Sequence, residues 1–156
     1  MRNTFGVIIV LLTCLLILPC SKDVNGADWI RFGKGEGGNE LFYDIQSINY
    51  LPNSSVRVLV KMIPEDEESR VRERAEWRKG YSEFPDNFSY STFLYEINCK
   101  DRTFKVLEGA TYNKENETII DTTIEYPRLD NISPESMMEG LYKIVCEEKD
   151  SKKKGQ

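Results

Sequence analysis

The clearest alternation of apolar and polar side chains lies in residues 56–63, VRVLVKMI. One side of this segment is entirely apolar and consists of Val56, Val58, Val60 and Met62. Arg57 and Lys61 fall on the other side, with Leu59 between them. Because successive side chains of a strand point to opposite faces, this period of two predicts a β-strand with one buried face.

The same period returns in residues 90–106, where a polar turn, KDR, separates two alternating runs. The first run places four side chains on a common face: Phe93, Tyr95, Ile97 and Cys99. Phe104 and Val106 continue the alternation after the turn. The pattern predicts a β-hairpin in which Cys99 points toward the core.

Three shorter segments complete the predicted sheet. Residues 29–32 and 39–44 form a hairpin across the glycine-rich segment GKGEGG, and residues 117–126 form a further strand rich in β-branched side chains. The glycine spacing matches neither a dinucleotide-binding nor a Walker motif, so we expect a turn rather than a phosphate-binding loop.

Residues 65–80 break the strand pattern with a run of charged side chains. Pro64 suits a helix start, the acidic run 65–68 suits the positive end of the helix dipole, and Gly80 ends the run. The apolar face is thin and consists of Val71, Ala75 and Trp77. We predict either a solvated helix or a mobile charged loop.

Residues 133–146, SPESMMEGLYKIVC, have the period of an α-helix. Ser133 suits the N-cap and Pro134 the first helical position. The apolar stripe consists of Met138, Leu141, Tyr142 and Val145, with Cys146 at its edge. The order of elements predicts an α+β fold, an antiparallel β-sheet with a C-terminal amphipathic helix packed on one face.

Residues 1–27 have the pattern of a signal peptide. Arg2 precedes an apolar run of about 14 residues, which is shorter than the roughly 20 that a membrane-spanning helix needs. Simple cleavage at the end of this range is the favoured outcome. The alternatives are a bacterial lipoprotein leader that ends before a lipidated Cys20, with Pro19 where a lipobox has a small residue, and an uncleaved anchor helix.

Without the leader, about 130 residues remain, the size of one ordinary domain. We expect a single domain over residues 28–148 and a disordered charged tail over residues 149–156. The net charge of −5 argues against a nucleic-acid partner. The chain has no histidine, which removes the usual catalytic triads and most zinc sites, so we expect no cofactor and no metal.

The leader predicts export to an oxidising compartment, which decides how the cysteines are interpreted. Cys14 leaves with the leader, and Cys20 leaves with it or is acylated, so Cys99 and Cys146 remain as a pair. Two cysteines in an exported chain predict a disulfide. The alternative is two free or metal-binding thiols, which lack the further Cys or His that a metal site needs.

One candidate binding site is an arginine stripe in the charged segment, Arg70, Arg74 and Arg78, together with Trp77. Guanidinium groups spaced by four residues share one helix face and bind carboxylates or sulfates in a bidentate manner. The alternative is that these charges pair within a solvated helix.

A carboxylate pair would be needed for a hydrolase in a chain without histidine. Asp44 and Glu96, on neighbouring strands of the predicted sheet, would then divide the acid and base roles. Nothing in the spacing selects this pair among 26 acidic residues. We therefore predict that the protein is not an enzyme.

Several segments resemble one known family. YSTFLYEINCKDRTFKVL and ISPESMMEGLYKIVC, preceded by DWIRFG, LFYDIQSI and VRVLVKM, are similar to the surface-adhesin protein E-like family of Gram-negative bacteria. The resemblance runs from Trp29 to Cys146. It implies an exported domain with a disulfide between Cys99 and Cys146, and adhesion to host matrix and serum proteins, often as a dimer.

These observations predict an exported binding or adhesion module of the cell envelope without a catalytic role. The expected partner is a protein, either extracellular or in the envelope, and a homodimer is one form of this partnership. The expected location is the periplasm, outer membrane or cell surface of a Gram-negative bacterium, with membrane attachment only through a lipid on Cys20. The alternative is an accessory periplasmic domain that contacts another envelope protein.

Overall fold

The computed structural model describes residues 26–35 and 37–147. The expectations for lipidation of Cys20 and for the tail over residues 149–156 concern residues outside these ranges. Among the described residues, none of the helices has the length and apolar character that crossing a membrane requires.

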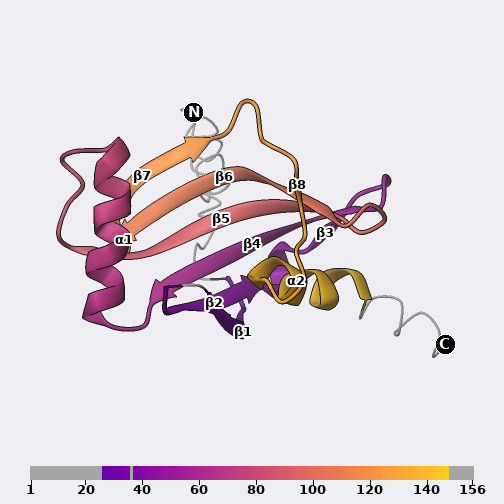
Figure 1. The fold of residues 1–156 in the computed structure, drawn as a ribbon, viewed down its shortest axis with the longest axis horizontal. Coiled ribbons are helices and arrows are strands. Elements are labelled where there is room, and N and C mark those ends of the chain that lie inside the picture. Colours follow the sequence, from indigo (N-terminus) through magenta and orange to yellow (C-terminus); the bar gives the residue numbers. More distant parts are fainter. Residues whose placement is uncertain (1–25, 36, 148–156) are drawn as a thin grey trace, which may run out of the picture.

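An antiparallel β-sheet forms the body of the domain (Figure 1). Its strands follow the spatial order β1-β2-β4-β5-β6-β7, while β3 pairs with β4 and β8 pairs with β6. The strands are β1 (Trp29–Gly35), β2 (Asn39–Asp44), β3 (Asn49–Tyr50), β4 (Ser55–Pro64), β5 (Phe88–Asn98), β6 (Thr103–Asn113), β7 (Thr118–Thr123) and β8 (Asp130–Asn131).

The central strands β4 and β5 are the two with the clearest alternation in the sequence. Their register places Val58 opposite Tyr95 and Val60 opposite Phe93. Val56, Val58 and Val60 are completely buried. The predicted strands are confirmed, and their shared apolar face forms one side of the core.

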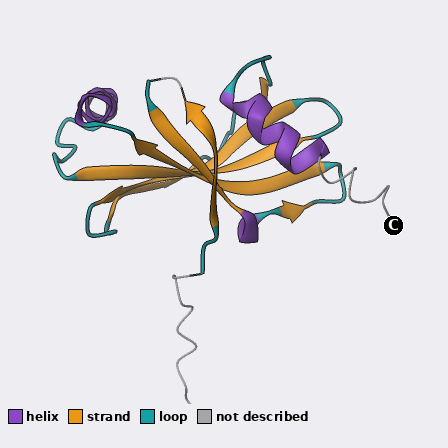
Figure 2. Ribbon diagram, turned by 90° about the horizontal axis from the view of Figure 1, so that it is seen from below, coloured by secondary structure: helices purple, strands orange, loops and turns teal. Residues whose placement is uncertain are grey.

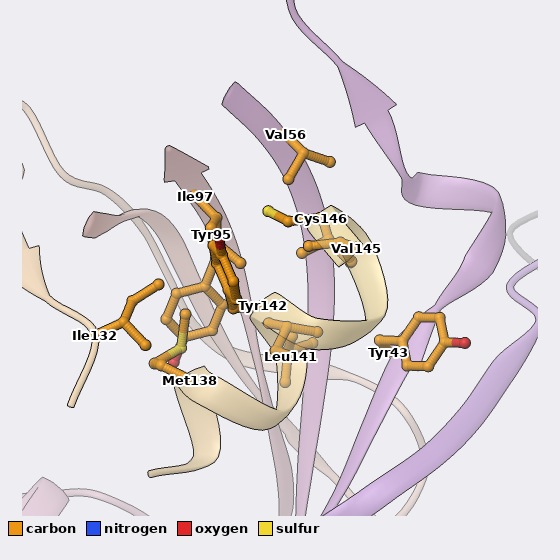
Figure 3. Close-up of a cluster of buried hydrophobic side chains, with 12 residues drawn as sticks. Tyr43, Val56, Tyr95, Ile97, Ile132, Met138, Leu141, Tyr142, Val145 and Cys146 are labelled. Atoms are coloured by element: carbon orange, nitrogen blue, oxygen red, sulfur yellow. The ribbon is translucent and has the colours of Figure 1, made fainter. Parts of the chain in front are cut away.

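The C-terminal helix α2 (Met137–Tyr142) continues directly into a π-helical turn, η2 (Lys143–Glu147). Leu141 and Val145 are fully buried in the same cluster as the valines of β4 (Figure 3). The Tyr142 hydroxyl donates a hydrogen bond to the carbonyl oxygen of Cys99 at 3.1 Å. The prediction of an antiparallel sheet with a C-terminal helix is confirmed.

A disulfide joins Cys99, directly after β5, to Cys146 in η2, with 5.6 Å between the Cα atoms. The predicted cross-link is confirmed, and it rules out the alternative of two free or metal-binding thiols. The C-terminal helical segment is therefore held to the sheet by a covalent bond as well as by packing.

The C-terminal helix begins three residues later than predicted. Its N-cap is Ser136, whose Oγ accepts a hydrogen bond from the backbone N–H of Glu139 at 3.2 Å. Glu135 has a φ of 61°, in the left-handed region, so the chain is not helical there. Ser133 and Pro134 therefore belong to the preceding turn.

Residues 67–80 form a helix, α1 (Glu67–Gly80), rather than a mobile loop. Its N-cap is Asp66, whose carboxylate accepts a hydrogen bond from the Ser69 N–H at 2.8 Å. The predicted start at Pro64 is wrong, because Pro64 is the last residue of β4 and pairs with Asn39.

Of the three residues predicted for the apolar face of α1, Trp77 faces inward, but Val71 and Ala75 do not. Val71 is 49% exposed, and Ala75 is exposed as well. The less exposed side of the helix carries Ser69, Glu73 and Trp77. The inward side makes both polar and aromatic contacts: Ser91 Oγ donates to Glu73 Oε1 at 3.1 Å, and the Trp77 ring stacks on buried Phe84.

Both helices lie over the same face of the sheet (Figure 2). α1 crosses one end of the strands, and α2 lies toward the other end (Figure 1). In the described part of the chain, the opposite face carries only a short 3-10 helix, η1 (Ile45–Ser47). We call this opposite side the open face.

Candidate functional site

The open face is hollowed into a groove with a cavity volume of about 560 Å³. Its lining comes from β1, β4, β5, β6 and β7 and includes Trp29, Leu59, Lys61, Tyr90, Leu94 and Tyr112. Apolar and aromatic walls with a few polar groups are typical of ligand-binding sites. We call this hollow the open-face groove.

The side chains of β4 that line the groove are those that point away from the core. Leu59 and Lys61 line it because Val58 and Val60, their neighbours in β4, point into the core. Both lining side chains are only partly exposed. The polar side of the predicted strand is therefore one wall of a cavity rather than a freely solvated surface.

Two tyrosines of the groove lining stack on each other, and we call them the tyrosine pair. Tyr90 of β5 is paired with Tyr112 of β6, and their rings stack with centroids 4.7 Å apart and planes 16° apart. The Tyr90 hydroxyl donates to Asn116 Oδ1 at 3.2 Å, which fixes the ring. Burial and the neighbouring Tyr112 raise the pKa of Tyr90, so its phenol stays neutral at physiological pH.

Lys61 holds a positive charge among these rings. Its Nζ lies 4.1 Å from the centroid of the Trp29 ring and 5.3 Å from that of Tyr90. Burial lowers the pKa of Lys61, and the charge of Asp44 partly offsets this effect. The Asp44 carboxylate is itself held at 3.0 Å by the backbone N–H of Gln46.

The rim of the groove is acidic. Glu108 of β6 and Asp121 of β7 line it and are exposed. The site therefore combines one cation among rings with carboxylates at the edge. This arrangement suits a ligand with a single negative charge and an apolar body.

The structure places two residues of the predicted arginine stripe, Arg74 and Arg78, against the loop that follows α1. Arg74 Nη1 donates to the carbonyl oxygen of Asp86 at 2.6 Å, and Arg78 Nη2 donates to its carboxylate at 2.9 Å. Arg70 pairs with Glu67 at 2.6 Å. Each of the three guanidinium groups therefore has a partner within the chain.

Trp77 also contacts residues of the loop that follows α1. Its ring stacks on Phe84 with centroids 5.6 Å apart and planes 10° apart, and Phe84 is buried. Arg78 Nε donates to the Phe84 carbonyl oxygen at 2.9 Å. Arg74, Trp77 and Arg78 therefore contact the loop 81–87, whereas Arg70 pairs within α1. The use of these four residues by a partner stays a prediction.

Asp44 and Glu96 are not on neighbouring strands, because β4 lies between β2 and β5. Glu96 pairs with Arg57 at 2.8 Å and with Lys105 at 2.9 Å. Burial alone would raise the pKa of Glu96, but the hydrogen bonds from Lys105 and Arg57 lower it overall. Asp44 instead caps η1, so the expected carboxylate pair is not assembled.

The described residues also contain no group of three His, Cys, Asp or Glu side chains arranged to hold a metal ion. The sequence reasoning missed the open-face groove. Lys61 was visible as a polar position, but its ring partners Trp29 and Tyr90 come from other strands. Only the strand order brings these three side chains together.

Comparisons with known proteins agree with this fold. The model of a protein family described as Surface-adhesin protein E matches residues 29–147. Crystal form II of Haemophilus influenzae protein E is 14% identical with a TM-score of 0.53, covering 81% of this chain and 91% of that one. A second structure of Haemophilus influenzae protein E is 13% identical with a TM-score of 0.51, covering 81% and 88%. At these identities the likeness concerns the fold alone, and no curated protein matches.

Proposed function

The chain belongs to the Surface-adhesin protein E family, and on this basis we propose that it is an exported adhesion-type module whose open-face groove contacts a protein partner. The observation that carries the proposal is the groove itself. One face of the sheet is covered by α1 and α2, whereas the other holds a cavity of about 560 Å³ lined by aromatic side chains. Aromatic residues are enriched where proteins bind one another.

The proposal places the module outside the cytoplasm of a Gram-negative bacterium, in the periplasm, the outer membrane or at the cell surface. Its disulfide supports this, because such bonds persist in oxidising compartments. The pattern of a signal peptide supports it independently. Cys20 is the expected lipid attachment site if the leader is of the lipoprotein type.

The module binds its partner without catalysing a reaction. Asp44 and Glu96, the two carboxylates considered for catalysis, both have structural partners. The partner is a protein outside the cell or in the envelope, and a second copy of this chain is one such partner.

Site-specific photo-cross-linking in intact cells tests the proposal. A photoreactive aromatic residue replaces Tyr112 in the groove, and the same residue replaces Val71 on the exposed side of α1 as the matched control. We expect adducts from position 112 and none from position 71. Equal yields at the two positions, or no adduct from a folded position-112 variant, would contradict the proposal.

The mass of the adducts identifies the partner, and protease added to intact cells identifies the location. A product of twice the chain mass identifies a second copy of the chain. Protection of the module from protease added to intact cells assigns it to the periplasm, and digestion assigns it to the surface. A further position, Ser82 in the loop that Arg78 contacts, tests separately whether a partner also binds on the face covered by α1.

A further inference from the structure

Lys61 is a partly buried cation, and its ammonium group has no hydrogen-bond acceptor within residues 26–35 and 37–147. The rings of Trp29 and Tyr90 lie 4.1 Å and 5.3 Å from its Nζ, and they stabilise the charge through their electron-rich faces. In the ranges that the structure describes, no carboxylate oxygen forms a salt bridge with it. An anion supplied from outside would add a charge-assisted hydrogen bond to this ammonium.

The tyrosine pair lies next to the same cation. Tyr90 contacts Lys61 and also stacks on Tyr112 at 4.7 Å, so one ring belongs to both features. Thr92 and Ala110, the next paired residues toward the middle of the sheet, are smaller and deepen the floor of the groove. A ligand ring that packs against the groove-facing edges of this tyrosine pair would therefore lie close to an anion bound at Lys61.

The acidic rim limits how much negative charge a bound ligand can carry. Glu108 and Asp121 are exposed at the edge of the groove, and the whole chain has a net charge of −5. These charges repel a polyanion such as a nucleic acid, a sulfated polysaccharide or an anionic membrane. They tolerate a single carboxylate whose surroundings are neutral or positive.

We propose that the open-face groove recognises a carboxylate next to an aromatic ring in a partner protein, with the carboxylate at Lys61 and the ring against Tyr90 and Tyr112. This inference rests on the proposed function, because it names the chemistry of the partner at the same groove. It requires that no second negative charge of the partner lies near Glu108 or Asp121.

The test is a titration of the purified, isotope-labelled exported protein followed by NMR. The probes are N-acetyl-tryptophan, its amide, which keeps the ring but lacks the carboxylate, and acetate, which lacks the ring. We expect N-acetyl-tryptophan to bind about ten-fold more tightly than either control, a difference of about 1.4 kcal/mol. The shifted signals should be those of Trp29, Lys61, Tyr90 and Tyr112.

Variants locate the effect. Lys61→Gln should abolish the preference for the acid over the amide, and Tyr112→Leu should weaken both. The matched control is Lys79→Gln on α1, where the lysine side chain is 69% exposed and pairs with Glu76. It should change neither affinity.

Equal affinity of the wild-type protein for the acid and the amide would overturn the inference, and this comparison needs no folded variant. So would shifts that map away from the groove, or the same loss in Lys79→Gln as in Lys61→Gln. Photo-cross-links from position 112 without any preference for the acid would overturn this inference alone. A preference for the acid without cross-links in cells would overturn the proposed protein partnership and leave the ligand chemistry supported.

Discussion

Glu73 of α1 is a carboxyl group held between the helix and the sheet. Its Oε1 accepts a hydrogen bond from Ser91 Oγ at 3.1 Å, whereas its buried Oε2 has no well-aligned donor among the residues that the structure describes. Burial raises the pKa of Glu73, and the nearby Ser91, Asn39 and Trp77 side chains offset this only in part. Burial therefore makes the charged form of Glu73 unfavourable in the folded protein.

The raised pKa of Glu73 makes the free energy of unfolding depend on pH. Because the folded-state pKa of Glu73 lies above its ordinary value of 4.5, the protein loses stability as the pH rises from that value through the raised pKa. We expect Glu73→Gln to increase the free energy of unfolding near neutral pH by about 1 kcal/mol, because a neutral amide is buried in place of a poorly satisfied charge.

Urea unfolding near pH 7 and near pH 4.5 checks this prediction, and the gain should shrink at the lower pH. The control is Glu76→Gln, where the carboxylate is exposed and pairs with Lys79. A Glu73→Gln protein that is no more stable than the control at neutral pH would show that the buried carboxylate carries no penalty.

At the scale of elements, the C-terminal helical segment is attached to the sheet in two ways. α2 has only six residues, too few to be stable alone, and it buries Met138, Leu141 and Tyr142 against the strands. The disulfide then ties η2 to the end of β5. Packing and the covalent bond act on the same segment.

We expect the double variant Cys99→Ser/Cys146→Ser to lose up to about 4 kcal/mol of unfolding free energy, because the bond closes a loop between residues separated by 47 positions. Binding should decline only as the folded fraction declines. Urea unfolding measures the first effect, and cross-linking from position 112 at matched folded fraction measures the second. Lost cross-linking in a fully folded variant would contradict the purely structural role of the two cysteines.

At the scale of the whole molecule, the sheet is covered on one face and has edges at β1 and β7. β4 and β5 lie in the middle of the strand order and carry the completely buried Val58 and Ile97. β7 is paired on one side, to β6. Local opening should therefore differ between the middle and the edge.

Amide hydrogen exchange should be slowest in β4 and β5 and fastest in β7. Mass spectrometry of peptic fragments at several protein concentrations measures this. If β7 is as well protected as β5 at every concentration, the assignment of β7 as a free edge is wrong. Protection of β7 that rises with concentration would show that a second copy covers it.

Much of the fold was predictable because its signals are local. The alternation around Val58 and Tyr95 reports the period of the backbone, so it predicts the strands before their partners are known. Helix ends were less predictable, because Ser133 and Ser136 are equally good caps by type. The left-handed conformation of Glu135 excludes the first.

The sequence by itself determined the central strands, the C-terminal helix and the pairing of Cys99 with Cys146, since periodicity and a count of cysteines are properties of a single chain. Only the tertiary structure decided which side of α1 faces inward and which side chains form the open-face groove. Trp29, Lys61 and Tyr90 come from three strands, and their meeting depends on strand order and register. Those are set by pairings between distant residues, which no local pattern contains.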